Sequence, residues 1–453
     1  MKIGIDISAL QGPHRMRGIG YALINFIDNI PEAYREQHSF IFYVLPYKNN
    51  GLENPTKLLT LKGLDYKIRF FNHAPEQEIK NGTLSIREVL HSLIPKPFDH
   101  LIRRFMHIYR STNVAAIKNL YMGDPRGQDL HDIDIYLQPD QSQPLPRKRH
   151  LRKILIIYDI IPYVLDGDYL SSYGMARKRG CSIKKSARLG SSRWLYAKKL
   201  HINAGRAQKL LAISQHTKND FVKFLGIDGN KIAITHLGAS KLIHRQKTPP
   251  KLRRYTETAW GYIPQVYHMP VNTPFLLYVG GTDRRRKLSD LVTAFNNLRA
   301  QGHNLKLVLS GDILQGPGNI PTEESREALL SSSYINDIIF MGFTDDATRD
   351  WLYCEALAFV YPSSYEGFGL PILEAMQYGT PVITYKNTSL YEVAGDAAIY
   401  ANDAMSIMQA VVKLLNDPSL RVRYSKLGKE RSAKYSWKTS ADNIMKALLS
   451  LPE

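Results

Sequence analysis

The chain has 453 residues, of which 44% are hydrophobic and 22% charged. This length exceeds what one hydrophobic core usually serves, so we expect two domains, and the composition excludes a wholly disordered chain. Sixty Lys and Arg residues against 41 Asp and Glu give a net charge of +19. Such an excess favours a polyanionic partner: nucleic acid, an anionic membrane surface or phosphorylated small molecules.

Two further features narrow the class of protein. The two cysteines, Cys181 and Cys354, lie far apart, which argues against a disulfide framework or a structural zinc site and favours a reducing cytosol. No apolar run reaches the roughly 18 residues of a membrane-spanning helix. We therefore expect a protein that is in solution or bound at a membrane surface.

The first half of the chain has the pattern of an α/β domain. Residues 3–10 form a β-rich run, a glycine-containing loop follows, and residues 21–27 have helical periodicity. Strands are predicted over 40–45, 134–137, 153–157 and 208–214, with a helix from Gln215. Residues 50–130, which mix Pro, Gly and charge, are interpreted as an insertion.

The second half repeats this rhythm after a Pro-, Arg- and Tyr-containing stretch over 241–272, interpreted as a linker with an insertion. Strands and helices are predicted over 274–281, 288–300, 305–311, 337–343, 356–363, 370–379, 380–385 and 397–401. Alternation of this kind predicts parallel sheets covered on both faces. We expect two Rossmann-like domains facing a cleft, over 1–240 and 273–436, with the C-terminal helix at about 437–453 returning to the first.

The most informative segment, residues 359–385, reads FVYPSSYEGFGLPILEAMQYGTPVITY. It predicts a strand, a glycine-bearing loop, a helix and another strand, the place where open parallel sheets bind ligands and where a helix start favours anions. Glu366 lies in the loop and Glu374 about one turn into the helix. The latter could accept both hydroxyls of a ribose, and the former could face a sugar beside a diphosphate. Both could equally be ordinary surface charges, and spacing alone does not decide.

This segment resembles the signature of retaining glycosyltransferases of the GT-B architecture, specifically their fourth family, which is rich in mannosyl- and glucosyltransferases. Glu366 and Glu374 match its E-x7-E motif, and the following SLYEVAGDAAIY also fits. The resemblance implies that Glu366 lies by the transferred sugar and that Glu374 binds the ribose. It also implies that sugar and phosphate are held by the backbone of Gly367, Phe368, Gly369 and Leu370.

Four consecutive cations, residues 284–287, stand between a predicted strand and helix. A leaving diphosphate requires positive charge, which arginine supplies bidentately, whereas the alternative is a solvated basic turn. The family usually has Pro-Arg-Lys-Asn here, and its lysine contacts the donor phosphates. Arg286 occupies the place of that lysine and Lys287 that of the asparagine. We expect Arg286 or Lys287 to bind the diphosphate, with Arg285 in support.

Three weaker matches complete the predicted site. Gly18 and Gly20, in the sequence RGIGY, match the glycine loop that faces the donor phosphates, although such a loop alone is a weak signal. Gly342 belongs to the stretch whose backbone contacts the nucleobase. Asp159 is kept from the family's His-Asp pair, but Tyr158 replaces the histidine, so a catalytic role of that histidine does not transfer. Tyr158 and Asp159 are candidates on the acceptor side.

The resemblance implies a hexosyltransferase, of mannose or glucose type, that uses a GDP- or UDP-sugar as donor in the C-terminal domain. Its acceptor would be a hydroxyl of a glycan or lipid-linked molecule in surface polysaccharide or glycolipid synthesis, bound by the N-terminal domain. No cofactor is expected. No Asp pair is placed to present a metal, so basic side chains and a helix dipole are expected to replace it. An inactive scaffold or a nucleotide-sugar epimerase are the alternatives, and no nucleic-acid-binding module is recognisable.

The positive charge is concentrated in the first half of the chain. Residues 171–200 carry nine cations and no Asp or Glu, and residues 97–110 could form a helix with one apolar face flanked by cations. Both features favour a cytoplasmic protein that is peripheral on the inner face of the plasma membrane. Alternatively, the helix docks on its own domain and the charges are solvated.

Overall fold

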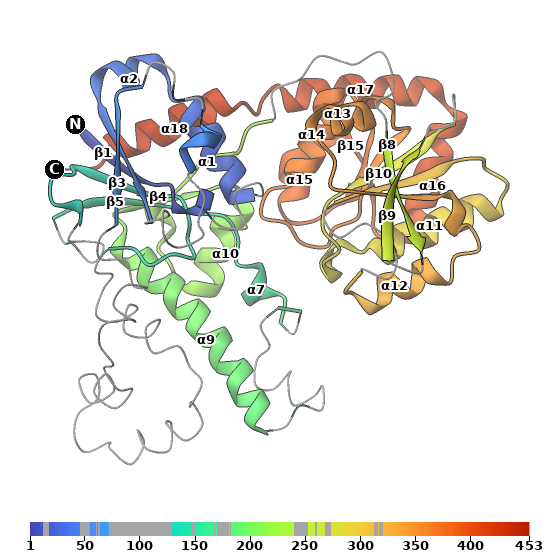
Figure 1. Cartoon of the computed structure of the whole chain (residues 1–453), viewed down its shortest axis with the longest axis horizontal. Coiled ribbons are helices and arrows are strands. Elements are labelled where there is room, and N and C mark those ends of the chain that lie inside the picture. Colours follow the sequence, from blue (N-terminus) through green and yellow to red (C-terminus); the bar gives the residue numbers. More distant parts are fainter. Residues whose placement is uncertain are drawn as a thin grey trace. The chain divides into compact units, whose positions relative to one another are not determined.

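The structure is a computed structural model of the whole chain (Figure 1). It describes residues 1–11, 18–45, 55–59, 61, 64–71, 129–146, 148, 150–166, 168–169, 181, 183–239, 252–258, 261–267, 273–311, 316 and 320–452. The chain divides into two compact units: unit 1 contains Met1–His236 and Trp437–Glu453, and unit 2 contains Leu237–Ser436.

Unit 1 is built on a parallel seven-stranded sheet in the order β3-β2-β1-β4-β5-β6-β7. The strands are β1 (Lys2–Asp6), β2 (Ser39–Val44), β3 (Tyr66–Phe70), β4 (Ile135–Gln138), β5 (Arg152–Ile157), β6 (Lys209–Ala212) and β7 (Ile232–Ile234). Most are nearly continuous apolar runs because helices cover both faces of a parallel sheet. β3, at one edge, is the exception, with largely exposed side chains.

The helices of unit 1 are α1 (Gly18–Asp28), α2 (Glu32–Gln37), α7 (Ile161–Val164), α9 (Ile183–Arg206), α10 (Gln215–Leu225) and α18 (Trp437–Leu449). Short 3-10 helices are η1 (Ser8–Gln11), η2 (Pro55–Leu58) and η5 (Gly229–Lys231). The last helix, α18, packs on α1, with the rings of Trp437 and Tyr21 edge to face at 5.9 Å. The end of the chain therefore contributes to the core of the unit in which the chain begins.

Unit 2 has a parallel six-stranded sheet in the order β12-β11-β10-β13-β14-β15. Its strands are β10 (Phe275–Val279), β11 (Lys306–Ser310), β12 (Ile338–Gly342), β13 (Ala358–Tyr361), β14 (Val382–Tyr385) and β15 (Ala398–Ala401). Its helices are η6 (Arg284–Arg286), α11 (Leu288–Ala300), α12 (Glu323–Leu330), η8 (Ile335–Asp337), α13 (Asp346–Glu355), α14 (Leu370–Tyr378), α15 (Thr388–Ala394), η9 (Gly395–Ala397), α16 (Ala404–Asn416) and α17 (Pro418–Ser432).

Between the two series, β8 (Leu252–Thr258) and β9 (Gly261–Tyr267) form an antiparallel hairpin, and β8 lies near β12. This hairpin falls within the stretch 241–272. The amphipathic helix expected near residues 97–110 lies outside the described residues, as does most of the 50–130 insertion. None of the helices in the described part of the chain combines the length and apolar character that crossing a bilayer requires.

The predicted α/β alternation is confirmed, with three local differences in the first half of the chain. The stretch 50–130, interpreted as an insertion, contains β3, which pairs with β2 as an edge strand of the main sheet. The strand predicted over 3–10 ends at Asp6, because the Asp6 carboxylate accepts a 2.8 Å bond from the backbone N–H of Ser8 and the chain turns into η1. The helix predicted from Tyr21 already begins at Gly18. In the second half, α11 and α14 begin at the residues where the pattern places them.

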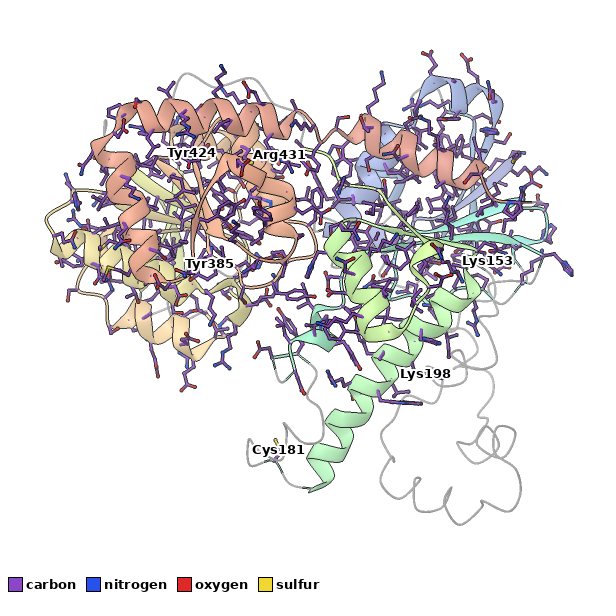
Figure 2. The ribbon with its side chains drawn as sticks, turned by 180° about the vertical axis from the view of Figure 1, so that it is seen from behind. Lys153, Cys181, Lys198, Tyr385, Tyr424 and Arg431 are labelled. Carbon is purple, nitrogen blue, oxygen red and sulfur yellow. The ribbon has the colours of Figure 1, made fainter. Side chains whose placement is uncertain are left out.

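Lys153 in β5 is a buried cation and gives a stability test of the unit 1 core (Figure 2). Its side chain is 3% exposed, and its ammonium donates to the carbonyl of Lys148. Burial and the charge of Arg206 lower the pKa of Lys153 to about 8 from its usual 10.5. Between these values the unfolded chain binds more protons than the folded one, so stability rises with pH.

We therefore expect the free energy of unfolding to rise between pH 8 and about 9.5, before the tyrosines titrate, and Lys153→Met to flatten this rise. Urea unfolding at several pH values measures it. Lys209→Met, on the neighbouring strand β6, is the matched control and should keep the rise. An unchanged slope in Lys153→Met would contradict the assignment.

Candidate functional site

The candidate site lies where β13 passes through a loop into α14. Gly369 precedes α14 with a φ of +104°, and a Cβ there would lie 2.8 Å from Cδ2 of Leu390. Only glycine fits such a position without strain and without a clash. Pro371 occupies the first turn, where a missing N–H costs nothing. The chain therefore turns sharply and presents the N-terminus of a helix at the carboxyl edge of the sheet.

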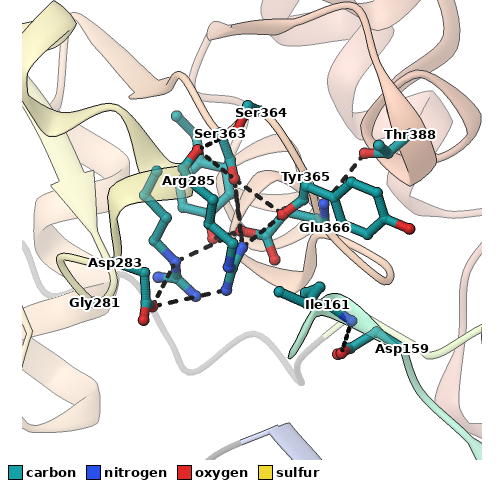
Figure 3. A network of polar contacts seen from close by, with 12 residues as sticks. Asp159, Ile161, Gly281, Asp283, Arg285, Ser363, Ser364, Tyr365, Glu366 and Thr388 are labelled. Atoms are coloured by element: carbon teal, nitrogen blue, oxygen red, sulfur yellow. Dashed lines mark hydrogen bonds and ion pairs between the residues drawn. The ribbon is translucent and has the colours of Figure 1, made fainter. Parts of the chain in front are cut away.

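Glu366, in this loop, is 7% exposed and is surrounded by donors (Figure 3). Its Oε1 atom accepts hydrogen bonds from Nη1 of Arg285, from the hydroxyl of Tyr361 at 2.8 Å and from the hydroxyl of Ser363 at 3.0 Å. Nε of Arg286 lies 3.6 Å from the same oxygen. Oε2 has no hydrogen-bond partner among the described residues. The hydrogen bonds from Arg285, Tyr361 and Ser363 to this carboxylate therefore all converge on Oε1.

The surroundings of Glu366 also set its charge. Burial raises the pKa of the carboxyl, but the charges of Arg285 and Arg286 and the hydrogen bond from Tyr361 outweigh burial and lower the pKa below its usual value. Glu366 is therefore ionised at neutral pH.

The loop is fastened by the residues that begin α15. The N–H of Glu366 donates to Oγ1 of Thr388 at 3.2 Å, and the hydroxyl of Ser389 donates to the carbonyl of Glu366 at 2.7 Å. Nδ2 of Asn387 donates to the carbonyl of Ser363 at 3.1 Å. Sequence reasoning missed this support, although three short polar residues directly after a strand are typical of side chains that bond nearby backbone.

The first three cations of the run form the 3-10 helix η6, and Lys287 follows it. The four side chains make different contacts. Arg285 is 8% exposed and, besides Glu366, donates to the carbonyl of Tyr365 at 2.7 Å. The guanidinium of Arg286 lies over the ring of Tyr361, 5.5 Å from its centroid. Arg284 is exposed, with Nε 3.6 Å from Oε2 of Glu324. Lys287 has a φ of +47° and precedes α11. Arg285, which was expected only to assist Arg286 or Lys287, is thus the arginine that hydrogen-bonds Glu366.

Gly280 explains how Arg286 fits beside the sheet. The glycine follows β10 with a φ of +154°, and a Cβ there would lie 2.2 Å from Nη1 of Arg286. Nε of Arg286 also lies 3.7 Å from Oδ2 of Asp283. The missing side chain at Gly280 therefore makes the space that the Arg286 guanidinium occupies.

Glu374 lies in α14, in different surroundings from Glu366. It is half-buried, and its Oε2 accepts a hydrogen bond from the hydroxyl of Tyr353 at 3.2 Å. Burial disfavours the charge of nearby Arg349, but Glu374 and other acids raise the pKa of that guanidinium above its usual value. The two glutamates of the motif are thus ordered by separate neighbours, one in the loop and one in the helix.

The remaining unit 2 candidates present backbone rather than side chains. Phe368 is 3% exposed and packs edge to face on Tyr435 at 5.9 Å, so its ring belongs to the core. Gly342 ends β12 with a φ of +59°, and its carbonyl accepts a 2.8 Å bond from the N–H of Gly311. Gly367 is buried, and Leu370 is the first residue of α14.

The unit 1 candidates form a separate set. Gly18 and Gly20 lie in the first turn of α1 rather than in a loop. Tyr158 is 7% exposed, and burial and the charge of Asp140 raise the pKa of its hydroxyl far above the usual value. Oδ1 of Asp159 accepts a 3.0 Å bond from the N–H of Ile161 at the start of α7. Within the described ranges, no group of three or more His, Cys, Asp or Glu residues is arranged to hold a metal ion.

Comparison with solved structures defines the class of fold. The chain matches a glycosyltransferase from Rickettsia africae ESF-5 with a TM-score of 0.57 and 14% identity, over 100% of this chain and 99% of that one. It matches WaaG, a glycosyltransferase involved in lipopolysaccharide biosynthesis, with a TM-score of 0.55 and 13% identity, over 100% of both. The chain has the GT-B fold, as predicted.

Comparison with families and curated proteins is more specific. Residues 263–431, most of unit 2, match the family "Glycosyl transferases group 1". The Escherichia coli O-antigen chain mannosyltransferase B is 30% identical over 55% of this chain and 62% of its own length. The Staphylococcus aureus capsular polysaccharide biosynthesis glycosyltransferase CapM is 25% identical over 50% and 57%. The matches thus span less than two thirds of these relatives. Unit 2 thus matches the group 1 glycosyl transferases, the family that the resemblance implied.

Gly369 gives a test of the local geometry. We expect Gly369→Ala to lower the free energy of unfolding by about 2 to 4 kcal/mol, because it adds a clash with Leu390 to the strain of a positive φ. Gly302→Ala is the control: its φ is +87°, but a Cβ there meets nothing within 4 Å, so it should lose only the strain component. Urea unfolding measures both, and equal losses would argue against the clash.

Proposed function

We propose that the chain is a retaining hexosyltransferase that moves a mannose- or glucose-type sugar from a GDP- or UDP-sugar to a hydroxyl of a glycan or lipid-linked acceptor. The proposal depends on one observation: an ionised, buried Glu366 held between Arg285 and Arg286 at the N-terminus of α14. The relatives support the sugar and the setting, because they include an O-antigen chain mannosyltransferase, a phosphatidyl-myo-inositol mannosyltransferase from Mycobacterium leprae and CapM. Surface polysaccharide or glycolipid synthesis is the proposed context.

The proposed roles follow the surroundings of each group. Oε2 of Glu366 faces the hexose, while Arg285 holds Oε1. The backbone from Gly367 to Leu370 and the helix start hold sugar and phosphate, since early N–H groups of a helix have no intrahelical acceptor. Glu374 accepts the ribose hydroxyls, and the stretch at Gly342 contacts the base.

The proposed reaction breaks the bond between the anomeric carbon and the diphosphate oxygen, which leaves with the bonding electrons. The acceptor hydroxyl oxygen bonds to the anomeric carbon on the same face and gives up its proton to the leaving diphosphate oxygen. Negative charge accumulates on the leaving diphosphate, and Arg286, with Lys287, stabilises it. Glu366 stabilises the positive charge that develops on the sugar ring. Tyr158 and Asp159 remain the proposed acceptor-side residues, with Gly18 and Gly20 toward the donor phosphates.

Glu366→Gln tests this function. The amide keeps the size of the side chain but removes its charge, so we expect kcat for sugar transfer to fall by about 100-fold or more while a nucleoside diphosphate still binds. Labelled GDP-mannose and UDP-glucose report transfer, and calorimetry with GDP and UDP reports binding. Glu327→Gln, an exposed glutamate on α12, is the matched control.

Three other outcomes of that experiment would contradict the proposal. Full transfer by Glu366→Gln would remove Glu366 from the mechanism. Interconversion of sugar nucleotides by the wild-type chain would indicate an epimerase. Binding without transfer or hydrolysis would indicate a scaffold.

An anionic membrane surface is the second proposed partner, and cations and aromatic rings on three helices of unit 1 support it. Arg193 of α9 lies over the ring of Tyr163 at 4.1 Å, and that ring is 6.5 Å from Phe224 of α10. Lys223 lies over the ring of Phe224 at 5.0 Å. Trp194, beside Arg193, is 54% exposed. We call these five residues the aromatic–basic cluster.

The charge of α9 matches such a partner. The helix extends away from the sheet of unit 1 (Figure 1), and its sequence contains no Asp or Glu. Lys198 is labelled on α9 in Figure 2. It follows Trp194 by four residues, about one helical turn, and therefore lies on the same side of the helix. Aromatic rings flanked by cations suit the interface of an anionic bilayer, because rings insert at the headgroup level and cations bind the phosphates.

We expect the wild-type chain to sediment with vesicles that contain phosphatidylglycerol and to remain in solution with phosphatidylcholine alone. Trp194→Ala combined with Lys198→Ala should weaken this binding about tenfold or more, since each cation near such a surface contributes about 1 kcal/mol. Leu330→Ala, a 61% exposed leucine on the acid-rich helix α12, is the control. Equal sedimentation with both lipids would refute the partner.

A further inference from the structure

Tyr361, the last residue of β13, contacts both charges of the candidate site with one side chain. Its hydroxyl donates to Oε1 of Glu366 at 2.8 Å, and its ring lies against the guanidinium of Arg286, with Cζ 5.5 Å from the ring centroid. The residue is 1% exposed. One buried side chain therefore contacts both the carboxylate of Glu366 and the guanidinium of Arg286.

The sheet fixes the position of this ring. Tyr361 pairs with Thr384 in the neighbouring strand β14, and the Thr384 hydroxyl donates to the carbonyl of Tyr361 at 2.7 Å. The ring stacks on Tyr278 at 5.9 Å and on Phe359 at 5.8 Å, with interplanar angles of 23° and 17°. Strand pairing and two stacked rings leave Tyr361 little freedom to move.

The Tyr361 ring holds Arg286 together with the Tyr278 hydroxyl, which also accepts a hydrogen bond from the guanidinium. Nε of Arg286 lies at 3.6 Å from Glu366 and 3.7 Å from Asp283, which are ion-pair distances rather than hydrogen bonds. Its Nη1 fills the space over Gly280. A planar guanidinium can lie against an aromatic face and still approach a carboxylate, whereas a compact ammonium interacts with such partners as a point charge.

We propose that Tyr361 is the positioning residue that aligns Glu366 and Arg286 with each other and with the donor. Its hydroxyl anchors Oε1 of Glu366, which leaves Oε2 for the sugar, and its ring holds Arg286 at the diphosphate. The proposal rests on the proposed function, because it names how the two charges of that site are placed. Burial raises the pKa of the Tyr361 hydroxyl well above its usual value, so the hydroxyl remains a donor over the working pH range.

Two substitutions separate the two contacts. Tyr361→Phe removes the hydroxyl and keeps the ring, so we expect kcat to fall about tenfold with little change in the Kd of GDP or UDP. The acidic limb of the profile of kcat/KM against pH should move to higher pH, because a hydrogen bond that lowers the pKa of Glu366 has been removed. Tyr361→Leu also removes the ring and should weaken GDP or UDP binding about tenfold further.

Phe359→Leu is the matched control for packing. Phe359 stacks on Tyr361 in the same strand and is fully buried, but its side chain has no polar group to bond Glu366. Because the pairing with β14 and the Tyr278 ring still hold Tyr361 in place, Phe359→Leu should lower Tm while leaving the pH profile and the Kd of the nucleoside diphosphates unchanged. A purely structural role for Tyr361 would make all three variants alike, and that result would overturn the proposal.

An unfolding measurement keeps the proposal separate from the proposed function. If the wild-type chain transferred no sugar, the proposed function would be refuted. The free energy of unfolding would still test whether Tyr361 anchors Glu366. Because the hydroxyl helps to lower the pKa of Glu366, Tyr361→Phe should lower the free energy of unfolding more at pH 7 than at acidic pH, since this contribution is lost as the pH falls through the lowered pKa of the folded chain. An equal loss at both pH values would contradict the anchoring role.

Discussion

The buried ion pair between Arg285 and Glu366 is the contact on which the candidate site depends. Both side chains are less than a tenth exposed, so each has lost most of its hydration. A pair of this kind contributes little net stability compared with well-packed apolar residues, but removing one partner leaves an uncompensated charge and costs about 3 to 5 kcal/mol. Stability alone therefore gives no reason for the pair. Its effect is to keep a carboxylate ionised at the edge of the sheet.

The topology of the parallel sheet brings the two partners together. Arg285 follows β10 and Glu366 follows β13. These strands are neighbours in the sheet, although 81 positions separate the two residues in the sequence. The carboxyl ends of parallel strands meet at one edge, so the segments after β10, β13 and β14 must converge there. Asn387, Thr388 and Ser389 after β14 then fasten the loop between them. The site is therefore a consequence of strand order rather than of any single motif.

Hydrophobic alternation in the sequence was enough to predict most strands of the two sheets and the start of α14. The glycines between β13 and α14 located the loop, and the family resemblance gave Glu366 and Glu374 their expected roles. The different contacts that the neighbouring arginines make could not be predicted in this way. Arg285 and Arg286 are adjacent and chemically identical, and only the backbone of η6, ending at the positive φ of Lys287, decides which one hydrogen-bonds Glu366 and which one lies over the Tyr361 ring. The early end of β1 was missed for a similar reason, because a side-chain bond from Asp6 redirects the chain without altering the apolar pattern.

Arg286 stands where the family pattern has a lysine, and its neighbours fit an arginine. The guanidinium needs more space than an ammonium, and Gly280 supplies that space through a conformation and a missing Cβ that other residues would not allow. It also benefits from an aromatic face, which Tyr361 supplies from another strand. Gly280, six positions before Arg286, and Tyr361, on another strand, thus both suit an arginine at this position. The departure from the family pattern is therefore matched by the residues around Arg286, and this match is consistent with the proposed function.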